Sequence, residues 1–261
     1  MTSDLSGMRT GLTIAGSDSS GGAGIQADLK TFAAHGVFGM TAITAVTAQN
    51  TQTVSRVLAL PPDMVTAQID AVLADIPPDA TKIGMLATSG IVEAVASALS
   101  RYHLRNVVFD TVMVAKGGAR LLDDEAVAML RERLLPLATI VTPNVPEAEA
   151  LTGLSIRTTA DLERAAVRLI ELGARAVLVK GGHLSGPAVD VLNDGQTTIQ
   201  LSAPRLDTRH THGTGCTLSS AIAARLALGD DLESACRAAK SYVTQAILRA
   251  PGLGKGHGPL G

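Results

Sequence analysis

Short apolar runs alternate with amphipathic segments along most of this 261-residue chain, and that alternation constrains its fold more than any other feature. The amphipathic segments lie near 24–35, 63–75, 89–102, 123–135 and 158–172. Short apolar strands separated by helices are typical of parallel βαβ units whose sheet is buried on both faces. We therefore expect an α/β fold with a mostly parallel central sheet and helices on both faces. The strand-like runs are Leu12–Ala15, Thr41–Ala48, Thr81–Met85, Val107–Asp110, Thr139–Thr142 and Ala176–Lys180.

Two places interrupt the alternation. Thr53–Leu60 follows the second apolar run too closely for a helical crossover, so it is either an edge strand or a flap. Val189–Leu192 and Thr197–Leu201 flank Asn193-Asp194-Gly195, which is a hairpin signal. These segments predict antiparallel additions to the parallel sheet.

The last third of the chain indicates two helices. The first begins near Gly215 and ends at Gly229, and the second begins at Asp230 or Asp231 and ends before Pro251. No repeat or long linker divides the chain. We expect one domain over residues 1–261, with residues 1–10 as a flexible extension.

Composition excludes several classes of partner. The chain has 22 Lys and Arg against 24 Asp and Glu, a formal net charge of -2, and only 2% aromatic residues. This balance argues against nucleic acid or an anionic membrane as the partner. The two cysteines cannot form a disulfide framework, and the sequence has neither a signal-peptide core nor an apolar run of membrane-spanning length. We expect a soluble cytoplasmic protein, and its function has to be inferred from its sites.

Ligands of open α/β sheets bind at the carboxyl ends of the strands, so the residues that follow each run are the candidates for a site. They include two glycine-rich turns, two amides, a carboxylate and an ammonium group. A structural alternative is that loops are polar and glycine-rich in any case. The candidates are the loop 16–24, Gln49-Asn50, Gly84-Met85, Asp110-Thr111, Pro143-Asn144 and Lys180-Gly181-Gly182.

The first glycine-rich loop does not indicate a dinucleotide site. Gly22-x-Gly24-x-x-Ala27 fits the Rossmann fingerprint only loosely, because it begins well beyond the strand. The second strand ends in Gln49-Asn50, with no acidic residue for a ribose hydroxyl. The chain also lacks a Walker-type phosphate loop and the Gly-x-Ser-x-Gly elbow of α/β-hydrolases.

The segment from Thr211 to Leu218 is the most informative. Gly213 and Gly215 open a helix whose free N–H groups can hold an anion such as a transferring γ-phosphoryl group. Cys216 lies in the first turn, where we expect the helix field to lower its thiol pKa and allow it to act as a base. The alternative is that Cys216 is a buried packing residue, as we expect for Cys236.

Several polar residues admit two interpretations each. Asp28 flanks the core stripe of its helix, where it either bonds a ligand or is capped and solvated. Asp110, Asn144 and Glu147 suit Mg²⁺, although Asn144 and Glu147 also fit a helix cap. Lys82-Ile83-Gly84-Met85 is an ordinary strand end in which Met85 could flank a flat ring. His210-x-His212 lacks a third ligand at zinc-site spacing.

The motifs that occur together resemble one known family. Its motifs are matched, in order, from about Leu12 to Ala250, so the resemblance covers nearly the whole chain. The chain resembles the bacterial hydroxymethylpyrimidine/phosphomethylpyrimidine kinases of thiamine biosynthesis, in the ribokinase-like superfamily. The matched motifs are Ala15–Asp28, Thr47–Thr51, Lys82–Met85, Asp110–Met113, Thr142–Ala148, Lys180–His183 and His212–Thr217.

The resemblance implies a ribokinase-like fold and a set of roles. The family uses MgATP to phosphorylate 4-amino-5-hydroxymethyl-2-methylpyrimidine and then its monophosphate, with a monovalent cation as a further candidate cofactor. Family members are commonly homodimers. Cys216 stands where most ribokinase-like enzymes have an aspartate base. The matching positions are Gly16, Asp28, Gln49, Met85 and Val112 for the pyrimidine; Gly213, Thr214, Gly215 and Cys216 for catalysis; Lys180, Asn144 and Thr211 for the nucleotide; and Asp110 and Glu147 for the metal.

Two alternatives to this function stay open. A pyridoxine/pyridoxal kinase is the first, because a related branch shares the Gly-Thr-Gly-Cys signature and also takes a flat ring with a hydroxymethyl group. Gln49 and Met85 favour the pyrimidine. A non-catalytic pyrimidine-binding protein is the second, and the intact Gly-Thr-Gly-Cys segment and Lys180 argue against it.

Overall fold

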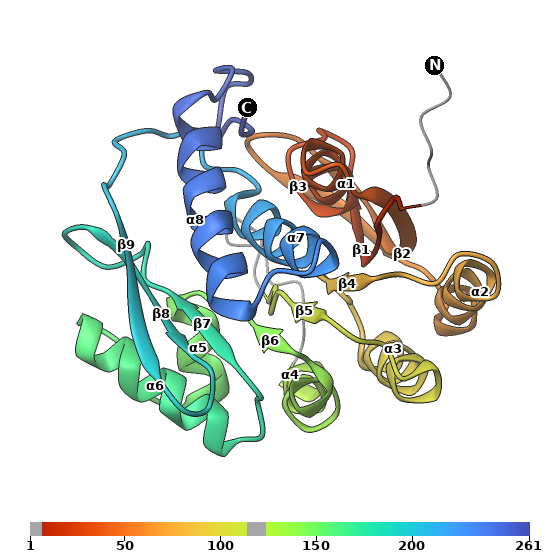
Figure 1. Cartoon of the computed structure of the whole chain (residues 1–261). Helices are drawn as coiled ribbons and strands as arrows, with labels where there is room; N and C mark the ends of the chain where they lie inside the picture. Colours follow the sequence, from red (N-terminus) through yellow and green to blue (C-terminus); the bar gives the residue numbers. More distant parts are fainter. Residues whose placement is uncertain (1–6, 114–123) are drawn as a thin grey trace.

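The computed structural model describes residues 7–113 and 124–261, and its strands form one nine-stranded sheet (Figure 1). The strand order is β3-β2-β1-β4-β5-β6-β7-β8-β9. The strands are β1 (Thr10–Asp18), β2 (Phe38–Gln49), β3 (Val54–Ala59), β4 (Ala80–Ile83), β5 (Val107–Phe109), β6 (Ile140–Val141), β7 (Val177–Lys180), β8 (Ala188–Asn193) and β9 (Thr198–Ala203).

The centre of the sheet is parallel and its edges are antiparallel. Strands β2, β1, β4, β5, β6 and β7 pair in parallel with one another, whereas β3, β8 and β9 pair antiparallel. The expected strand near residues 53–60 is therefore an edge strand. The expected hairpin is confirmed, and the Asp194 carboxylate accepts hydrogen bonds from the N–H groups of Gln196 and Thr197 in its turn.

Helices cover both faces of the sheet, as the alternation predicts. Helices α2 to α6 pack on one face through a core that includes Ile69, Val95 and Leu169, and α1, α7 and α8 pack on the other through Phe32 and Ile222 (Figure 1). The helices are α1 (Gly24–Ala34), α2 (Pro62–Leu73), α3 (Ser89–Tyr102), α4 (Asp124–Met129), α5 (Val145–Thr152), α6 (Thr159–Glu171), α7 (Thr214–Ala227) and α8 (Leu232–Leu248).

Helix boundaries follow the capping residues. Asp231, rather than Asp230, is the N-cap of α8, and its side chain accepts a hydrogen bond from the N–H of Ser234. In the segment expected as a helix over 123–135, residue 123 lies outside the described residues. The α4 helix there widens into a π-type turn at Leu130–Leu134 and ends in a short 3₁₀ turn at Leu135–Leu137, where proline stops it.

Residues 9 and 10 are held by contacts to Asp79, within the segment expected to be a flexible extension. The Arg9 guanidinium lies 2.9 Å from an Asp79 carboxylate oxygen, and the N–H of Thr10 donates to the same carboxylate. β1 itself begins at Thr10, so the expected flexible extension through residue 10 is too long at its end. Residues 1–6 lie outside the described residues.

Candidate active site

A cavity of about 890 Å³ opens at the carboxyl end of the parallel strands. It lies where the sequence predicts a ligand site, and its size is in the range of small-molecule and cofactor sites. Apart from Asp28, every residue expected in the site lines this cavity: Gly16, Gln49, Met85, Asp110, Val112, Asn144, Glu147, Lys180, Thr211, Gly213, Thr214, Gly215 and Cys216.

Two glycine-rich loops meet at the cavity because only glycine fits at their contact. Gly213, the N-cap of α7, has φ 80°, and a Cβ atom on it would lie 1.8 Å from the Gly22 carbonyl oxygen. The Thr214 hydroxyl, in turn, donates to the carbonyl oxygen of Thr211 at 2.7 Å. The start of α7 is thus fixed against the loop that follows β1.

The start of α7 also faces the charged residues at the ends of β5 and β7. A Cβ atom added to Gly215 would lie 3.4 Å from Lys180 Nζ and 3.6 Å from Asp110 Oδ2. The first N–H groups of a helix have no partner within the helix and carry its positive end. Helix N–H groups, an ammonium and a carboxylate therefore converge within a few ångströms, an arrangement that suits a phosphoryl group and its metal ion.

Asp110 is buried and has one oxygen to spare. Lys180 Nζ donates to Asp110 Oδ1 at 2.9 Å, while Oδ2 has no hydrogen-bond partner among the described residues. Burial by itself would raise the pKa of the Asp110 carboxyl, but the Lys180 and Lys82 ammonium groups outweigh it and hold that pKa below its usual range. Asp110 is an ionised carboxylate with a free lone-pair face.

Glu147 takes the helix-cap role, one of the two interpretations that the sequence allows. Its side chain accepts hydrogen bonds from the N–H of Asn144 and the Thr111 hydroxyl, and the Asn144 side chain accepts from the N–H of Glu147. The helix-cap interpretation is therefore confirmed as a capping box. Burial raises the pKa of Glu147 to about 6, and the neighbouring Asp110 charge adds to the rise while Lys180 opposes it.

These carboxylates fit Mg²⁺ better than a metal held by the protein alone. Among the described residues no group of three His, Cys, Asp or Glu side chains could hold a metal ion. Mg²⁺ is commonly bound through one or two carboxylates, several waters and substrate phosphates. A Mg²⁺ ion held in this way would give the unpartnered Asp110 Oδ2 a ligand to bind.

The expected low pKa of Cys216 is wrong. Burial raises the pKa of this thiol to about 11, and the Asp28 and Asp110 carboxylates raise it further, against the Lys82 ammonium and the N–H of Gly24. The thiol is mostly protonated at neutral pH, because loss of solvation outweighs the field of the helix. Cys236, expected to be a packing residue, is confirmed in the core of α8.

Asp28 does not line the cavity, although the resemblance implies a ligand contact for it. It is 0% exposed and pairs with Lys82, whose Nζ lies 2.9 and 3.0 Å from its two oxygens. The hydroxyls of Thr13 and Ser220 also donate to it, each at 2.6 Å. Asp28 is therefore a buried counter-ion beneath the cavity, and Lys82 is the member of the pair that lines it.

Lys82 is a functional candidate that the sequence interpretation passed over as an ordinary strand end. Burial would lower the pKa of its ammonium, but the Asp28 carboxylate raises the pKa above its ordinary value. The signal was present in the sequence. A lysine inside an apolar strand and an aspartate beside a core stripe each need a partner, and buried charges are found in pairs.

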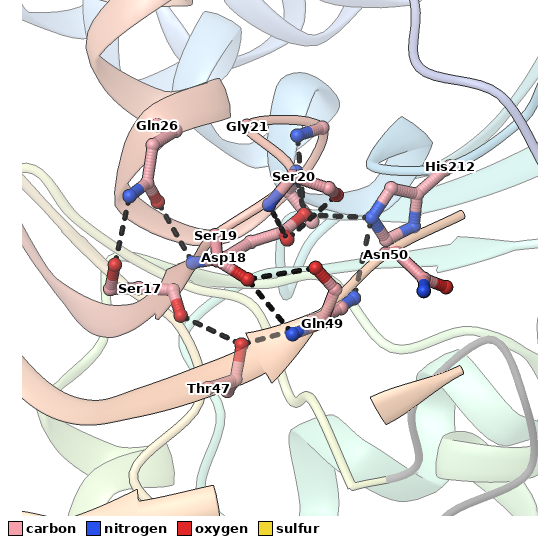
Figure 2. A network of polar contacts seen from close by, with 12 residues as sticks. Ser17, Asp18, Ser19, Ser20, Gly21, Gln26, Thr47, Gln49, Asn50 and His212 are labelled. Carbon is pink, nitrogen blue, oxygen red and sulfur yellow. Dashed lines mark hydrogen bonds and ion pairs between the residues drawn. The ribbon is translucent and has the colours of Figure 1, made fainter. Parts of the chain in front are cut away.

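Asp18 and His212 form a second buried pair of polar side chains, which Figure 2 shows. His212 Nε2 lies 2.8 Å from Asp18 Oδ2 and 3.3 Å from Gln49 Nε2. Burial by itself would raise the pKa of Asp18, but hydrogen bonds from His212 and Ser20 lower it. All three of Asp18, His212 and Gln49 line the cavity.

Gly16 and Met85 form an apolar part of the cavity wall. A Cβ atom on Gly16 would lie 3.5 Å from Met85 Cε, so these two residues are in contact across the cavity wall. The Thr44 hydroxyl donates to the Met85 carbonyl oxygen at 2.6 Å and fixes the end of β4. Val112 and Gln49 also line the cavity, so it offers apolar groups and a side-chain amide to a ligand.

Comparison with known proteins identifies the family. The family model described as phosphomethylpyrimidine kinase matches residues 18–261. A hydroxymethylpyrimidine/phosphomethylpyrimidine kinase of Bacillus subtilis is 50% identical over 250 residues, 95% of this chain and 92% of that protein. The thiamine biosynthesis bifunctional protein ThiED of Geobacter sulfurreducens is 54% identical over 95% of this chain, which spans 51% of that protein.

A solved structure extends the comparison to the fold. The ADP complex of Bacillus subtilis pyridoxal kinase superposes with a TM-score of 0.91, at 44% identity and 97% coverage of both chains. The sheet order, this superposition and the similar kinases define a ribokinase-like small-molecule kinase, a phosphotransferase. Within that class, the chain belongs to the phosphomethylpyrimidine kinase family.

Proposed function

We propose that this protein transfers the γ-phosphoryl group of ATP to 4-amino-5-hydroxymethyl-2-methylpyrimidine and then phosphorylates the monophosphate to the diphosphate, as in thiamine biosynthesis. The observation that carries the proposal is the meeting of the α7 start, Lys180 and Asp110 in the same cavity as Gln49 and Met85. One side suits a phosphoryl group and the other a flat ring with a hydrogen-bonding edge.

The chemistry follows from that arrangement. The hydroxymethyl oxygen attacks the γ-phosphorus, the bond from that phosphorus to its bridging oxygen breaks, and ADP leaves. The N–H groups of Gly215 and Cys216 donate to the oxygens of the transferring group, and Lys180 offsets their charge. The Cys216 thiolate accepts the hydroxyl proton and becomes the thiol. Because burial raises the pKa of this thiol to about 11, the thiolate fraction increases with pH.

Asp110 and Glu147 would hold Mg²⁺ beside the nucleotide phosphates, with Asn144 and Thr211 on the nucleotide side. The ion would supply positive charge for the phosphate oxygens. We expect Glu147→Gln to raise the Mg²⁺ concentration needed for half-maximal activity, because an amide binds Mg²⁺ less well than a carboxylate. The amide can still accept the capping hydrogen bonds. A variant that only melts at lower temperature, with unchanged Mg²⁺ dependence, would leave helix capping as the sole role of Glu147.

An ADP-release assay tests the proposed activity. The acceptors are the aminopyrimidine alcohol, its monophosphate, pyridoxal and none. ADP release with the first two, above the rate without acceptor, supports the proposal. Binding of the alcohol without ADP release would indicate the non-catalytic alternative.

Pyridoxal kinase activity is the second candidate. Its support is the superposition on Bacillus subtilis pyridoxal kinase at a TM-score of 0.91. Both rings are flat and carry a hydroxymethyl group, so the same phosphate side would serve. In the assay above, a kcat/KM for pyridoxal that exceeds the value for the aminopyrimidine would favour this function.

We also propose a single-domain, cytoplasmic protein that forms a homodimer. The edge strand β3 exposes Val57 and Leu58, the latter at 67%, beside the exposed Val46 of β2. Apolar side chains on a sheet edge favour contact with a second copy. Light scattering after size-exclusion chromatography gives the mass directly. No helix within residues 7–113 and 124–261 is long and apolar enough to cross a membrane.

A further inference from the structure

Both the oxygen and the nitrogen of the Gln49 carboxamide lie within hydrogen-bond distance of protein side chains. Its Oε1 lies 3.2 Å from Thr47 Oγ1, and its Nε2 lies 3.3 Å from His212 Nε2 (Figure 2). The same His212 nitrogen lies 2.8 Å from Asp18 Oδ2. The donors and acceptors of these four side chains determine the orientation of the Gln49 amide.

The proton on His212 is committed to Asp18. An ionised carboxylate only accepts hydrogen bonds, so His212 Nε2 must carry the proton that joins the two groups. A protonated His212 Nε2 has no lone pair to accept a hydrogen bond from an NH₂ group. With the Gln49 nitrogen at that position, two donors would face each other. The Thr47 hydroxyl has one proton and donates it to the Ser17 carbonyl oxygen at 2.9 Å, which leaves Gln49 Oε1 as an acceptor against an acceptor.

Exchanging the two ends of the Gln49 amide resolves both conflicts at once. The amide oxygen then accepts from His212 Nε2–H, which it shares with Asp18, and the NH₂ group donates to Thr47 Oγ1. We propose that His212, held by Asp18 as the Nε2–H tautomer, is a positioning residue that fixes the Gln49 amide in this orientation and thereby selects the ring edge that the cavity accepts.

Asp18 and His212 are suited to this role because backbone groups of the loop that follows β1 hold both side chains. Asp18 accepts hydrogen bonds from the N–H groups of Ser20 and Ala23, at 2.8 and 2.9 Å, which fix its carboxylate. A Cβ atom on Gly22 would lie 2.5 Å from His212 Cδ2, so the imidazole ring packs directly on the backbone of the first loop. The order of donor and acceptor is thus set by groups that the ligand does not move.

A fixed amide discriminates between two kinds of ring. A 4-aminopyrimidine presents an amino donor beside a ring-nitrogen acceptor, and its 4-oxo analogue presents the reverse order. An amide that is free to turn by 180° pairs with either edge, whereas an amide held by His212 pairs with only one. Which ring is preferred rests on the proposed function. The loss of discrimination on removal of the His212 hydrogen bond to Gln49 does not depend on that proposal.

The test compares kcat/KM for the aminopyrimidine and its 4-oxo analogue in wild type, His212→Leu and His212→Gln. We expect His212→Leu to reduce the ratio of the two values about tenfold, mainly through KM, because one mismatched buried hydrogen bond no longer penalises the analogue. His212→Gln keeps an N–H donor near the position of Nε2 and restores the ratio. His35→Leu, which removes a histidine bonded to Thr31 on α1, is the matched control and leaves the ratio unchanged.

A second readout needs no substrate. Long-range ¹H–¹⁵N correlation NMR of the wild-type protein reports which His212 nitrogen carries the proton, and we expect Nε2. A proton on Nδ1 alone would overturn the proposal, and so would equal losses for both rings in His212→Leu and His212→Gln. Absence of wild-type activity on both pyrimidines would instead count against the proposed function, while the NMR result would still decide the tautomer.

Discussion

The charged side chains in the cavity and directly beneath it pair with one another. Lys180 pairs with Asp110, and Lys82 pairs with Asp28, in both cases with little or no exposure. A buried charge is tolerated only when it is paired and hydrogen-bonded, so each residue fixes the ionisation of the next. For single residues, we therefore expect a substitution to affect one substrate, as at Gln49, or one step, as at Cys216.

Gln49→Leu keeps the side-chain volume and removes the amide. The ring then loses a buried hydrogen-bonding partner, which costs about 1–3 kcal/mol. We expect the KM for the aminopyrimidine to rise roughly tenfold or more, with little change in the KM for ATP. Steady-state kinetics with each substrate varied in turn measures both. A parallel rise in the two KM values would place Gln49 outside the ring-binding side.

Cys216→Ser distinguishes the base from the packing residue. If Cys216 accepts the proton, kcat falls by roughly 10²–10⁴ while both substrates still bind. Cys216→Asp recovers part of the rate, because a carboxylate can serve as the base. Near-normal turnover by Cys216→Ser, with damage by Cys216→Asp, would instead show packing alone.

The pH profile gives an independent check on Cys216. Since burial raises the pKa of its thiol to about 11, the thiolate fraction grows as pH rises toward that value. We expect wild-type kcat to increase with pH between 7 and 9, and kcat of Cys216→Asp to be flatter over the same range. A flat wild-type profile would contradict the thiol as the base.

At the scale of elements, one buried ion pair joins three of them. Asp28 of α1 contacts Lys82 of β4 and Ser220 of α7, so it ties two helices to the sheet directly beneath the cavity. Asp28→Asn leaves Lys82 without its counter-ion, and we expect a loss of about 3–5 kcal/mol in the free energy of unfolding. Chemical denaturation measures this loss.

The matched control for that prediction is Glu233→Gln, which breaks the exposed pair between Glu233 and Arg237 on α8. Both side chains of this pair are about half exposed, and exposed pairs contribute at most about 1 kcal/mol. If the two variants lose the same free energy, the buried pair does not hold these elements together.

The sequence was sufficient to predict the elements and one side of the site. Lys180 and Asp110 end apolar strands, and parallel strands bring their carboxyl ends to one edge, so local pattern and topology place both residues. Asp28 and His212 could not be placed in this way. Their partners lie 54 and 194 positions away in sequence, and only the packing of α1 and α7 on the sheet decides those contacts. The thiol pKa was missed because it depends on burial as well as on helix position.

At the scale of the whole molecule, residues at the carboxyl ends of strands from both halves of the sheet line the same cavity. Gln49 and Met85 lie at or just after the ends of β2 and β4, and Asp110 and Lys180 lie at or just after the ends of β5 and β7. The C-terminal segment closes one side, where the N–H of His257 donates to the Thr51 carbonyl oxygen at 2.8 Å and His257 lines the cavity. A single cavity therefore suits both phosphorylation steps.

The same cavity should serve phosphoryl transfer to the pyrimidine alcohol and to its monophosphate. A ³¹P NMR time course with MgATP and 4-amino-5-hydroxymethyl-2-methylpyrimidine follows both products in one sample. We expect a phosphomonoester resonance that appears first and then gives way to the diphosphate, with ADP formed at each step, and we expect Lys180→Met to slow both steps. Nucleotide turnover without a phosphorylated pyrimidine, or a variant that abolishes one step and leaves the other at its full rate, would contradict this expectation.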